Sequence, residues 1–327
     1  MFDLIIIGAG PAGITAAFEA KRHGLSHLAI EKGLIGNTIY NYPVGLTVFS
    51  TTNELEIIEG GLSPAREKPT REELLSYYVR IVLDNELNVQ TEETVLSVEK
   101  LTDHFNVVTD KGSYKSDSVL FAMGSMDYPR RLNAKGEDLP KVHFQFRETY
   151  PWVKKRALIV GGGNSAGEAA LFLAQEGAET TLAIFREDWE NTDPKQGCIK
   201  YWVKQPLENE LQQKCLNLFF LGRVIEIRES EVELESETGE RVVLSNDVVF
   251  VLIGSDADLT ILKSLGVETV MGKYGEIPVY DEMSFETNVA GVYVAGHFTA
   301  QRHIKGAIDA SRQLIPQLAA RIHSAVR

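Results

Sequence analysis

The chain has 327 residues, of which 44% are hydrophobic and 24% charged, and its net charge is −13. This length suits two domains of ordinary size, with cores that need no metal or disulfide. The acidic balance disfavours broad contact with nucleic acid or an anionic membrane, and no apolar run is long enough to span a bilayer. Cys198 and Cys215 fit neither a C-x-x-C pair nor a zinc cluster. A strand predicted from residue 2 leaves no room for a leader, so we expect a cytoplasmic protein with reduced thiols.

The chain opens with an apolar run that leads into a glycine fingerprint. Residues 2–7 are of strand length, and the pattern G-x-G-x-x-G follows at Gly8, Gly10 and Gly13, before a predicted helix at 14–20. Gly8 permits a tight turn, Gly10 lets the backbone approach a pyrophosphate, and Gly13 lets helix and strand pack closely. The helix N-terminus offers N–H donors to the phosphates. The pattern therefore predicts a dinucleotide-binding loop.

The segment after this loop predicts further contacts to a nucleotide. A second strand at 27–30 ends on Glu31, which stands 23 residues after Gly8, where a carboxylate takes the ribose hydroxyls. The loop 36–45 then alternates turn formers with tyrosines. Such a loop suits an aromatic ring system as ligand, with a packed loop under the sheet as the alternative.

The next hundred residues predict a capped helix, a meander and a buried strand. Thr70 and Glu73 form a capping box for a helix at 69–82. A strand at 118–125 ends on small residues, which let a ligand approach the backbone. A turn-rich passage at 128–140 predicts a domain crossover. The short alternating segments predict three antiparallel strands, at 94–99, 105–109 and 113–117.

The opening pattern recurs from Gly161. A strand at 156–160 leads into Gly161 and Gly163, with Ala166 in the third position, where alanine is an accepted variant. After a strand at 180–185 comes Arg186, 25 residues beyond Gly161. An arginine there favours the 2′-phosphate of NADP over a bare ribose, so we predict NADPH rather than NADH. A solvent-facing arginine is the alternative, and the acidic residues that follow weaken the preference.

Two dinucleotide folds in one chain indicate two cofactors that exchange electrons, a tightly held flavin and a diffusible nicotinamide. The segment 197–206 is basic and aromatic, so Lys200 and Lys204 are candidates for phosphate contact, with a solvated helix start as the alternative. A helix at 306–322 closes the chain, and Pro316 predicts a kink or a division there. Further strands are predicted at 224–227, 232–234, 247–254 and 290–298.

These residues resemble the thioredoxin-reductase-like flavoprotein disulfide reductases, and more specifically the bacillithiol-disulfide reductase (YpdA-type) family. The resemblance implies an α/β fold with two Rossmann-like dinucleotide-binding domains of the three-layer ββα type. It implies an FAD domain at 1–125 and 256–327, and an inserted NADPH domain at 126–255. Homodimers are common in this fold. The stretches that carry the closer resemblance are 31–33, 37–43, 49–50, 55–57, 75–78, 136–142, 199–200 and Trp202.

The glycine loops and the resemblance together predict the cofactor contacts. In the family, the first loop and the strand ends at Ala122 and Gly296 contact FAD, and the second loop binds NADPH. Arg186 is predicted as the clamp for the 2′-phosphate. The predicted cofactor-binding residues are Gly8, Gly10, Pro11, Ala12, Gly13, Glu31, Lys32, Tyr40, Asn41, Phe49, Val95, Ala122, Gly124, Gly161, Gly163, Asn164, Ser165, Ala166, Arg186, Lys200, Gly254, Gly296 and His297.

The chain departs from the family at two positions. The family places its redox cysteine where this chain has Ala12, and alanine forms no mixed disulfide. The wider superfamily places an aspartate where this chain has His297. Neither change affects the backbone contacts to FAD. The departure at Ala12 leaves no certain catalytic residue, and Cys198 is the one candidate for a substitute thiol.

The leading functional hypothesis is an FAD-dependent oxidoreductase that takes hydride from NADPH and reduces a low-molecular-weight thiol disulfide. The first alternative is a thiol-free NADPH:acceptor reductase of the ferredoxin/flavodoxin–NADP reductase type, which the missing cysteine favours. The second alternative is a non-catalytic flavin-binding protein. The expected partner is thus a small-molecule disulfide or a small electron-carrier protein.

Overall fold

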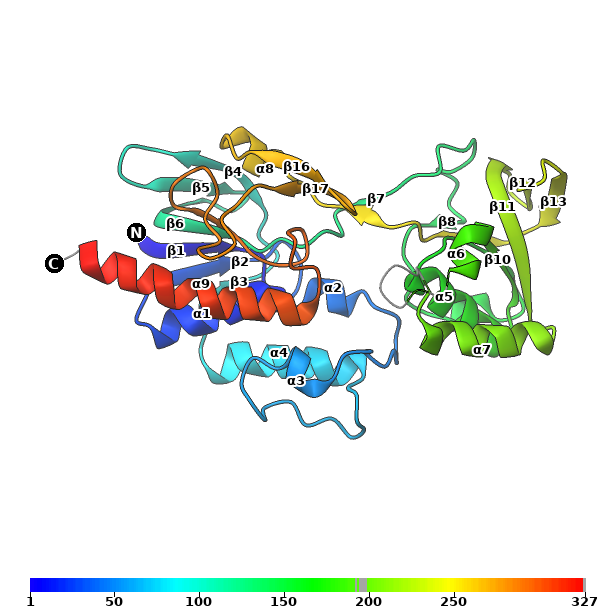
Figure 1. Cartoon of the computed structure of the whole chain (residues 1–327), viewed down its shortest axis with the longest axis horizontal. Helices are drawn as coiled ribbons and strands as arrows, with labels where there is room; N and C mark the ends of the chain where they lie inside the picture. The colour runs from blue at the N-terminus through cyan, green and yellow to red at the C-terminus, as the bar shows by residue number, and fades with distance from the viewer. Residues whose placement is uncertain (192, 194–198, 326–327) are drawn as a thin grey trace. The chain divides into compact units, whose positions relative to one another are not determined.

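The computed structural model describes residues 1–191, 193 and 199–325. Its chain forms two compact units, which are Met1–Tyr128 with Asp256–Arg327, and Pro129–Ser255. The second unit is therefore inserted into the sequence of the first (Figure 1). The chain passes between the units in two short strands that pair with each other, β7 (Tyr128–Pro129) and β15 (Ser255–Asp256). Which nucleotide each unit binds stays a prediction.

The first unit is built on a parallel sheet that continues into an antiparallel meander. Its central strand β1 lies between β2 and β6, and β6 also pairs with β18. The long strand β6 changes partners at Ser116, which is opposite both Phe2 of β1 and Phe105 of β5. The strands of this sheet are β1 (Phe2–Ile7), β2 (His27–Ile30), β3 (Val89–Gln90), β4 (Val95–Lys100), β5 (Phe105–Thr109), β6 (Ser113–Phe121) and β18 (Val292–Val294). A separate two-stranded sheet pairs β16 (Thr269–Gly272) with β17 (Gly275–Pro278).

Side chains of β1 alternate between two cores, because successive residues of a strand point to opposite faces. Leu4 and Ile6 belong to the core under the helices, whereas Ile5 and Ile7 belong to the core on the meander side. A strand buried on both faces needs an uninterrupted apolar run, which explains the opening sequence. The unit therefore has three layers, of helices, parallel sheet and meander.

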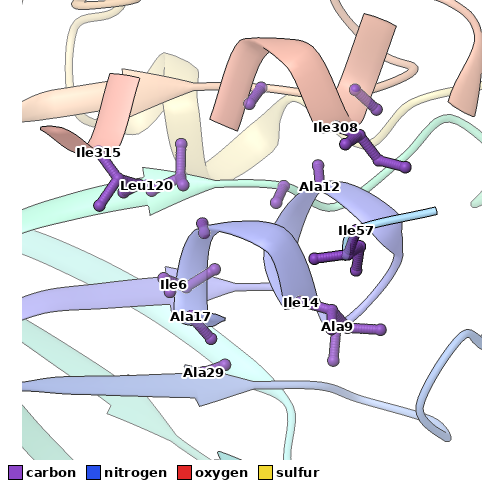
Figure 2. Packing of buried hydrophobic residues seen from close by; sticks show 14 of the residues in the cluster. Ile6, Ala9, Ala12, Ile14, Ala17, Ala29, Ile57, Leu120, Ile308 and Ile315 are labelled. Carbon is purple, nitrogen blue, oxygen red and sulfur yellow. The ribbon is translucent and has the colours of Figure 1, made fainter. Parts of the chain in front are cut away.

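The helical layer of the first unit consists mainly of α1, α4 and α9, and α1 lies beside α9 (Figures 1 and 2). The predicted capping box at α4 is confirmed, since Glu73 N–H donates to Thr70 Oγ1 and Thr70 N–H donates to the Glu73 carboxylate. The helices are α1 (Pro11–Arg22), α2 (Asn37–Tyr40), α3 (Thr52–Leu55), α4 (Arg71–Asp84), α8 (Thr260–Ser264) and α9 (Ile304–Ala325).

The second unit repeats this plan. Its parallel strands β10, β9, β14 and β8 continue through β11 into the meander with β12 and β13. Ala157 and Ile159 of β9 face the helix-side core, and Leu158 and Val160 face the meander-side core. Its elements are β8 (Val142–His143), a 3₁₀ turn (Tyr150–Trp152), β9 (Arg156–Val160), α5 (Asn164–Gln175), β10 (Glu179–Ile184), α6 (Arg186–Glu190), α7 (Tyr201–Gln212), β11 (Leu216–Ile227), β12 (Glu231–Ser236), β13 (Arg241–Ser245) and β14 (Val248–Val251).

Three sequence expectations were wrong in detail, and a fourth was wrong in part. The strands predicted at 113–117 and 118–125 are one strand, β6, because the segment passes from the meander into the parallel sheet without a turn. The strand predicted at 224–227 is only the end of β11, and β13 was not predicted at all. Residues 37–40 form a helical turn instead of a loop. Of the two outcomes predicted at Pro316, the division does not occur, because α9 runs as one helix, and the kink stays a prediction.

Candidate functional site

In the first glycine loop, a side chain would clash with the backbone at two of the three fingerprint glycines, which we call closed. At the other glycine, which we call open, there is room for a side chain or a ligand. A Cβ added at Gly8, where φ is +108°, would lie 2.5 Å from the carbonyl oxygen of Ala122, and a Cβ at Gly13 would lie 1.9 Å from the carbonyl oxygen of Gly8. By contrast, no described atom lies within 4 Å of a Cβ at Gly10. Gly10 is also the N-cap of α1, which begins with Pro11 and receives no side-chain cap from the described residues. The loop thus leaves open the position where a pyrophosphate approaches backbone N–H groups.

Glu31 is buried at the end of β2 and ties the loop together. One carboxylate oxygen accepts from Ala9 N–H and the other from Gly33 N–H, both at 2.8 Å. The structure thus gives Glu31 a role that its spacing did not predict, as an acceptor for the loop backbone. Its contact with a ribose stays a prediction.

Other predicted contacts of the first unit are spread over its surface and core. Lys32 forms an ion pair with Asp127. The carbonyl oxygen of Tyr40 accepts from the buried Arg71, and Asn41 caps the short helix α2. The remaining predicted residues in this region lie as follows: Phe49 is exposed, Val95 packs at the edge of the meander-side core, and Gly124 has a φ of +74° after β6.

Five residues come together at the strand ends beside the first loop. A Cβ added at Gly296, which follows β18, would lie 3.3 Å from the Cβ of Ala12. Ala12 itself is only 4% exposed, on the side of α1 that faces α9 (Figure 2), and its carbonyl oxygen accepts from Ser311 Oγ at 2.9 Å. Next to Gly296, His297 Nδ1 lies 2.6 Å from Ser125 Oγ. The structure therefore joins the predicted positions Ala12, Gly296 and His297 around one end of the sheet.

His297 is a neutral histidine at physiological pH. Desolvation by the surrounding protein, together with the nearby charges of Arg302 and His303, lowers its pKa to about 4. The ring still has an exposed surface. A neutral imidazole has one N–H donor and one acceptor nitrogen, so the ring forms one hydrogen bond with Ser125 and keeps its other nitrogen for solvent or a ligand.

The second glycine loop follows the same geometry. A Cβ at Gly161, where φ is +151°, would lie 2.3 Å from the carbonyl oxygen of Leu252, and a Cβ at Gly163 would meet no described atom within 4 Å. Gly163 is the N-cap of α5, again without a side-chain cap from the described part of the chain. Ala166 occupies the third position and is fully buried. The second loop therefore also has a closed first glycine and an open middle glycine at the start of a helix. We call each of these two loops a glycine cradle.

The residues around the second loop differ from those around the first. Asn164 Oδ1 accepts from the backbone N–H of Lys200 at 2.8 Å, which joins two predicted contacts, and Ser165 is exposed. Arg186 does not point a free guanidinium outward, because Glu237 and Glu190 both accept from it. The other two candidates lie elsewhere in the unit: Gly254 has a φ of +98° after β14, and Lys204 donates to the carbonyl oxygen of Trp189.

Three acidic residues of the second unit, Asp188, Glu168 and Glu237, have surroundings that were not predicted. The sequence indicated only Asp188, as one of the acidic residues after Arg186 that weaken the preference for NADPH. Asp188 places Oδ2 only 2.3 Å from where a Gly162 Cβ would be. Glu168, one turn into α5, is half-buried, and the described residues give its carboxyl no hydrogen bond or ion pair. Desolvation raises the pKa of Glu168 to about 7. Glu168 could have been found from the sequence, because it stands directly after the glycine fingerprint. The pairing of Glu237 with Arg186 could not, because it depends on the fold.

The cysteines contribute no site in the described structure. Cys198 lies outside the described residues, and Cys215 is exposed after α7. Within the described residues, no cluster of His, Cys, Asp or Glu is arranged to hold a metal ion. None of the described helices is long and apolar enough to cross a membrane.

The model of the pyridine nucleotide-disulphide oxidoreductase family matches residues 5–296. The chain belongs to this family. It is 35% identical to the bacilliredoxin reductase Bdr of Bacillus subtilis, over 90% of this chain and 89% of that one. It superposes on a Staphylococcus aureus structure, the bacillithiol disulfide reductase Bdr (YpdA), with a TM-score of 0.90 and 32% identity over 98% of each chain. It is also 29% identical to a ferredoxin–NADP reductase of Ignicoccus hospitalis, over 91% of this chain and 90% of that one.

Membership makes the chain an oxidoreductase and confirms the predicted resemblance and α/β fold. The family implies a flavin and a nicotinamide cofactor. The structure fits two such groups, because each unit has one glycine loop in which the first glycine is closed against a carbonyl and the middle glycine is open. The predicted contacts of individual residues to these cofactors stay predictions.

Proposed function

We propose that the chain is an FAD-dependent oxidoreductase that uses NADPH to reduce a low-molecular-weight thiol disulfide of the bacillithiol-disulfide type. The observation that carries the proposal is the pair of open glycine cradles, Gly8–Gly13 and Gly161–Gly167, in a chain that superposes on bacillithiol disulfide reductases over nearly its whole length. The same resemblance supports a cytoplasmic homodimer.

In this proposal each unit holds one cofactor. The first unit would hold FAD at Gly10, where there is room beside the backbone, and at the uncapped start of α1. Glu31 would hold the loop in shape through its hydrogen bond from Ala9 N–H. The second unit would hold NADPH at the corresponding Gly163 and the start of α5. When bound, the two cofactors supply hydride transfer, a reaction that needs stacking and positioning more than an acid or base from the protein.

The experiment reconstitutes the purified protein with FAD and follows the flavin absorbance under anaerobic conditions. We expect bound flavin, bleaching by NADPH, and recovery of the oxidised spectrum when bacillithiol disulfide is added. A protein that binds no flavin after reconstitution contradicts the whole proposal. Cys198→Ser with unchanged disulfide turnover removes that residue as the substitute thiol.

A second function, reduction of an electron-carrier protein, is favoured by one specific observation. The family's redox cysteine is replaced by Ala12, which has no thiol. Ferredoxin–NADP reductases are among the relatives that match nearly the full chain. A reductase of this type passes electrons from flavin to carrier and needs no redox thiol in the protein. If NADPH bleaches the flavin and ferredoxin or flavodoxin restores its colour while no disulfide does, this second function is correct and the first is wrong.

A further inference from the structure

Two carboxylates hold Arg186 in the second unit. Arg186 opens α6, with one residue between it and the end of β10, and its Nε donates to both carboxylate oxygens of Glu237, at 2.7 and 2.9 Å. Nη2 also donates to Glu237, and Nη1 donates to Glu190 at 3.3 Å. The guanidinium carbon lies 3.8 Å from the centre of the Phe220 ring. All three guanidinium nitrogens therefore donate to a carboxylate.

The segment that carries Arg186 lies against the second glycine loop. Two residues further on, Asp188 places its Oδ2 2.3 Å from where a Gly162 Cβ would be, so this position accepts only glycine while the carboxylate is there. In the first unit, Glu31 accepts from Ala9 N–H, and Ala9 holds the place that corresponds to Gly162. The start of α6 thus borders the second cradle, where an arginine suits the 2′-phosphate of NADP.

Glu237 engages the Nε–Nη2 edge of Arg186, which is one of the edges through which an arginine can bind a phosphate. Its carboxylate engages Nε and Nη2 together, and a phosphate binds arginine in the same two-pronged way. The two side chains are 45% and 30% exposed, and an ion pair with this much solvent is weak and exchangeable. A 2′-phosphate can therefore displace Glu237 from Arg186. The displaced carboxylate remains near the phosphate, and the two negative charges repel each other.

We propose that Glu237 sets the nicotinamide selectivity of this protein by competing with the 2′-phosphate of NADPH for Arg186. The proposal rests on the proposed function, because it assumes that the second unit binds the nicotinamide dinucleotide. NADH carries no 2′-phosphate and does not need Arg186 to be released. Glu237 consequently weakens the binding of NADPH but not of NADH. The protein therefore discriminates less between the two coenzymes than it would if Arg186 were not paired with Glu237.

The test uses 2′,5′-ADP and 5′-AMP as probes, with and without the 2′-phosphate, and measures their binding to the FAD-loaded protein by calorimetry. We expect Glu237→Gln to lower the Kd of 2′,5′-ADP by about three- to tenfold, the size expected for one screened charge, and to leave 5′-AMP within twofold. In Arg186→Gln/Glu237→Gln this gain disappears. The matched control is Glu235→Gln on β12, which removes the same charge from a carboxylate that pairs with Arg223 at 3.0 and 3.1 Å.

The outcomes separate this proposal from the function on which it rests. Equal effects of Glu237→Gln and Glu235→Gln on 2′,5′-ADP overturn the competition, because they indicate only a general change of charge. An unchanged NADPH-to-NADH ratio of flavin bleaching in Glu237→Gln also overturns it, while the proposed function stands. If neither probe binds and neither coenzyme bleaches the flavin of the wild-type protein, the proposed function itself is wrong.

Discussion

The two glycine loops share the geometry of their first and middle glycines but differ at the third position and in the side chains around them. In each, the first glycine is closed against a carbonyl of the neighbouring strand, and the middle glycine is open. Around the first loop the acidic residue Glu31 is buried, and both of its oxygens bind backbone N–H groups. Around the second loop Arg186 pairs with Glu237 at a partly exposed surface.

This difference matches the two kinds of cofactor in the proposed function. A cradle closed by a buried carboxylate suits a resident flavin, since its walls are held by hydrogen bonds that do not depend on the ligand. A cradle bordered by exposed, exchangeable ion pairs suits a coenzyme that enters and leaves in every turnover. In the proposed function, therefore, the backbone of each loop would place the dinucleotide, and the surrounding side chains would select which one binds.

The largest effect is expected from the third position of each loop. Gly13→Ala would place a methyl 1.9 Å from the Gly8 carbonyl oxygen, so we expect it to abolish flavin retention and to lower the free energy of unfolding by about 3 kcal/mol. The matched variant Ala166→Gly, in a loop that already accommodates the methyl, should cost about 1 kcal/mol. Flavin content after reconstitution and urea unfolding measure both. A Gly13→Ala protein with full flavin content would show that the two loops are not distinguished by this position.

The second prediction concerns the first turns of α1 and α5. Counting from Gly8 and Gly161, Thr15 and Glu168 hold the same place. Thr15 is buried and donates to the Pro11 carbonyl oxygen at 2.7 Å, whereas desolvation raises the pKa of Glu168 to about 7. A raised carboxyl pKa means that the folded protein holds the proton more tightly than the unfolded chain. The corresponding stabilisation is complete below about pH 4.5 and is lost as the pH rises through 7.

Glu168→Gln mimics the protonated carboxyl, so it should be neutral near pH 4.5 and stabilise the protein by about 2 kcal/mol at pH 8. Urea unfolding at the two pH values measures this difference. Glu176→Gln, at the exposed end of the same helix, is the control for removing one carboxylate charge from α5. A stabilisation by Glu168→Gln that is equal at both pH values would mean that the raised pKa is not the cause.

The backbone of these sites was more predictable from the sequence than their side-chain partners. A glycine fingerprint encodes local geometry, so Gly8, Gly10 and Gly163 were placed correctly on loops between a strand and a helix. Glu237 lies 51 residues from Arg186, and the two meet only because β11 crosses from the parallel sheet into the meander. No residue pattern within β11 marks the point where the strand leaves the parallel sheet. The strand β6 also passes between a meander and a parallel sheet, and for this reason it was predicted as two strands.

Position 12 gives the third prediction. Ala12 is buried and its Cβ faces Gly296, while Ser165, at the same place in the second loop, is exposed. Ala12→Cys restores a thiol that can form a mixed disulfide, at a packing cost of about 1 kcal/mol. We expect disulfide turnover with NADPH to rise about tenfold, equivalent to about 1.4 kcal/mol. Ala12→Ser is the control without a thiol. Equal rates in the two variants would favour the carrier-protein reductase instead.

The smallest effect is expected where the first strand of each unit begins. Asp3 of β1 accepts from Ser26, whereas Arg156 at the start of β9 donates to Asp247 through its backbone N–H, Nε and Nη2, at 2.9, 3.0 and 2.6 Å. Hydrogen bonds from Arg156 hold the pKa of Asp247 well below its usual range. The stabilisation is therefore present above about pH 4 and is lost as the pH falls further.

Both side chains are about a third exposed, so Asp247→Asn should cost only about 1 kcal/mol at pH 7. A cost that is the same at pH 3 and pH 7 would show that the backbone hydrogen bond, and not the charge, makes the contribution.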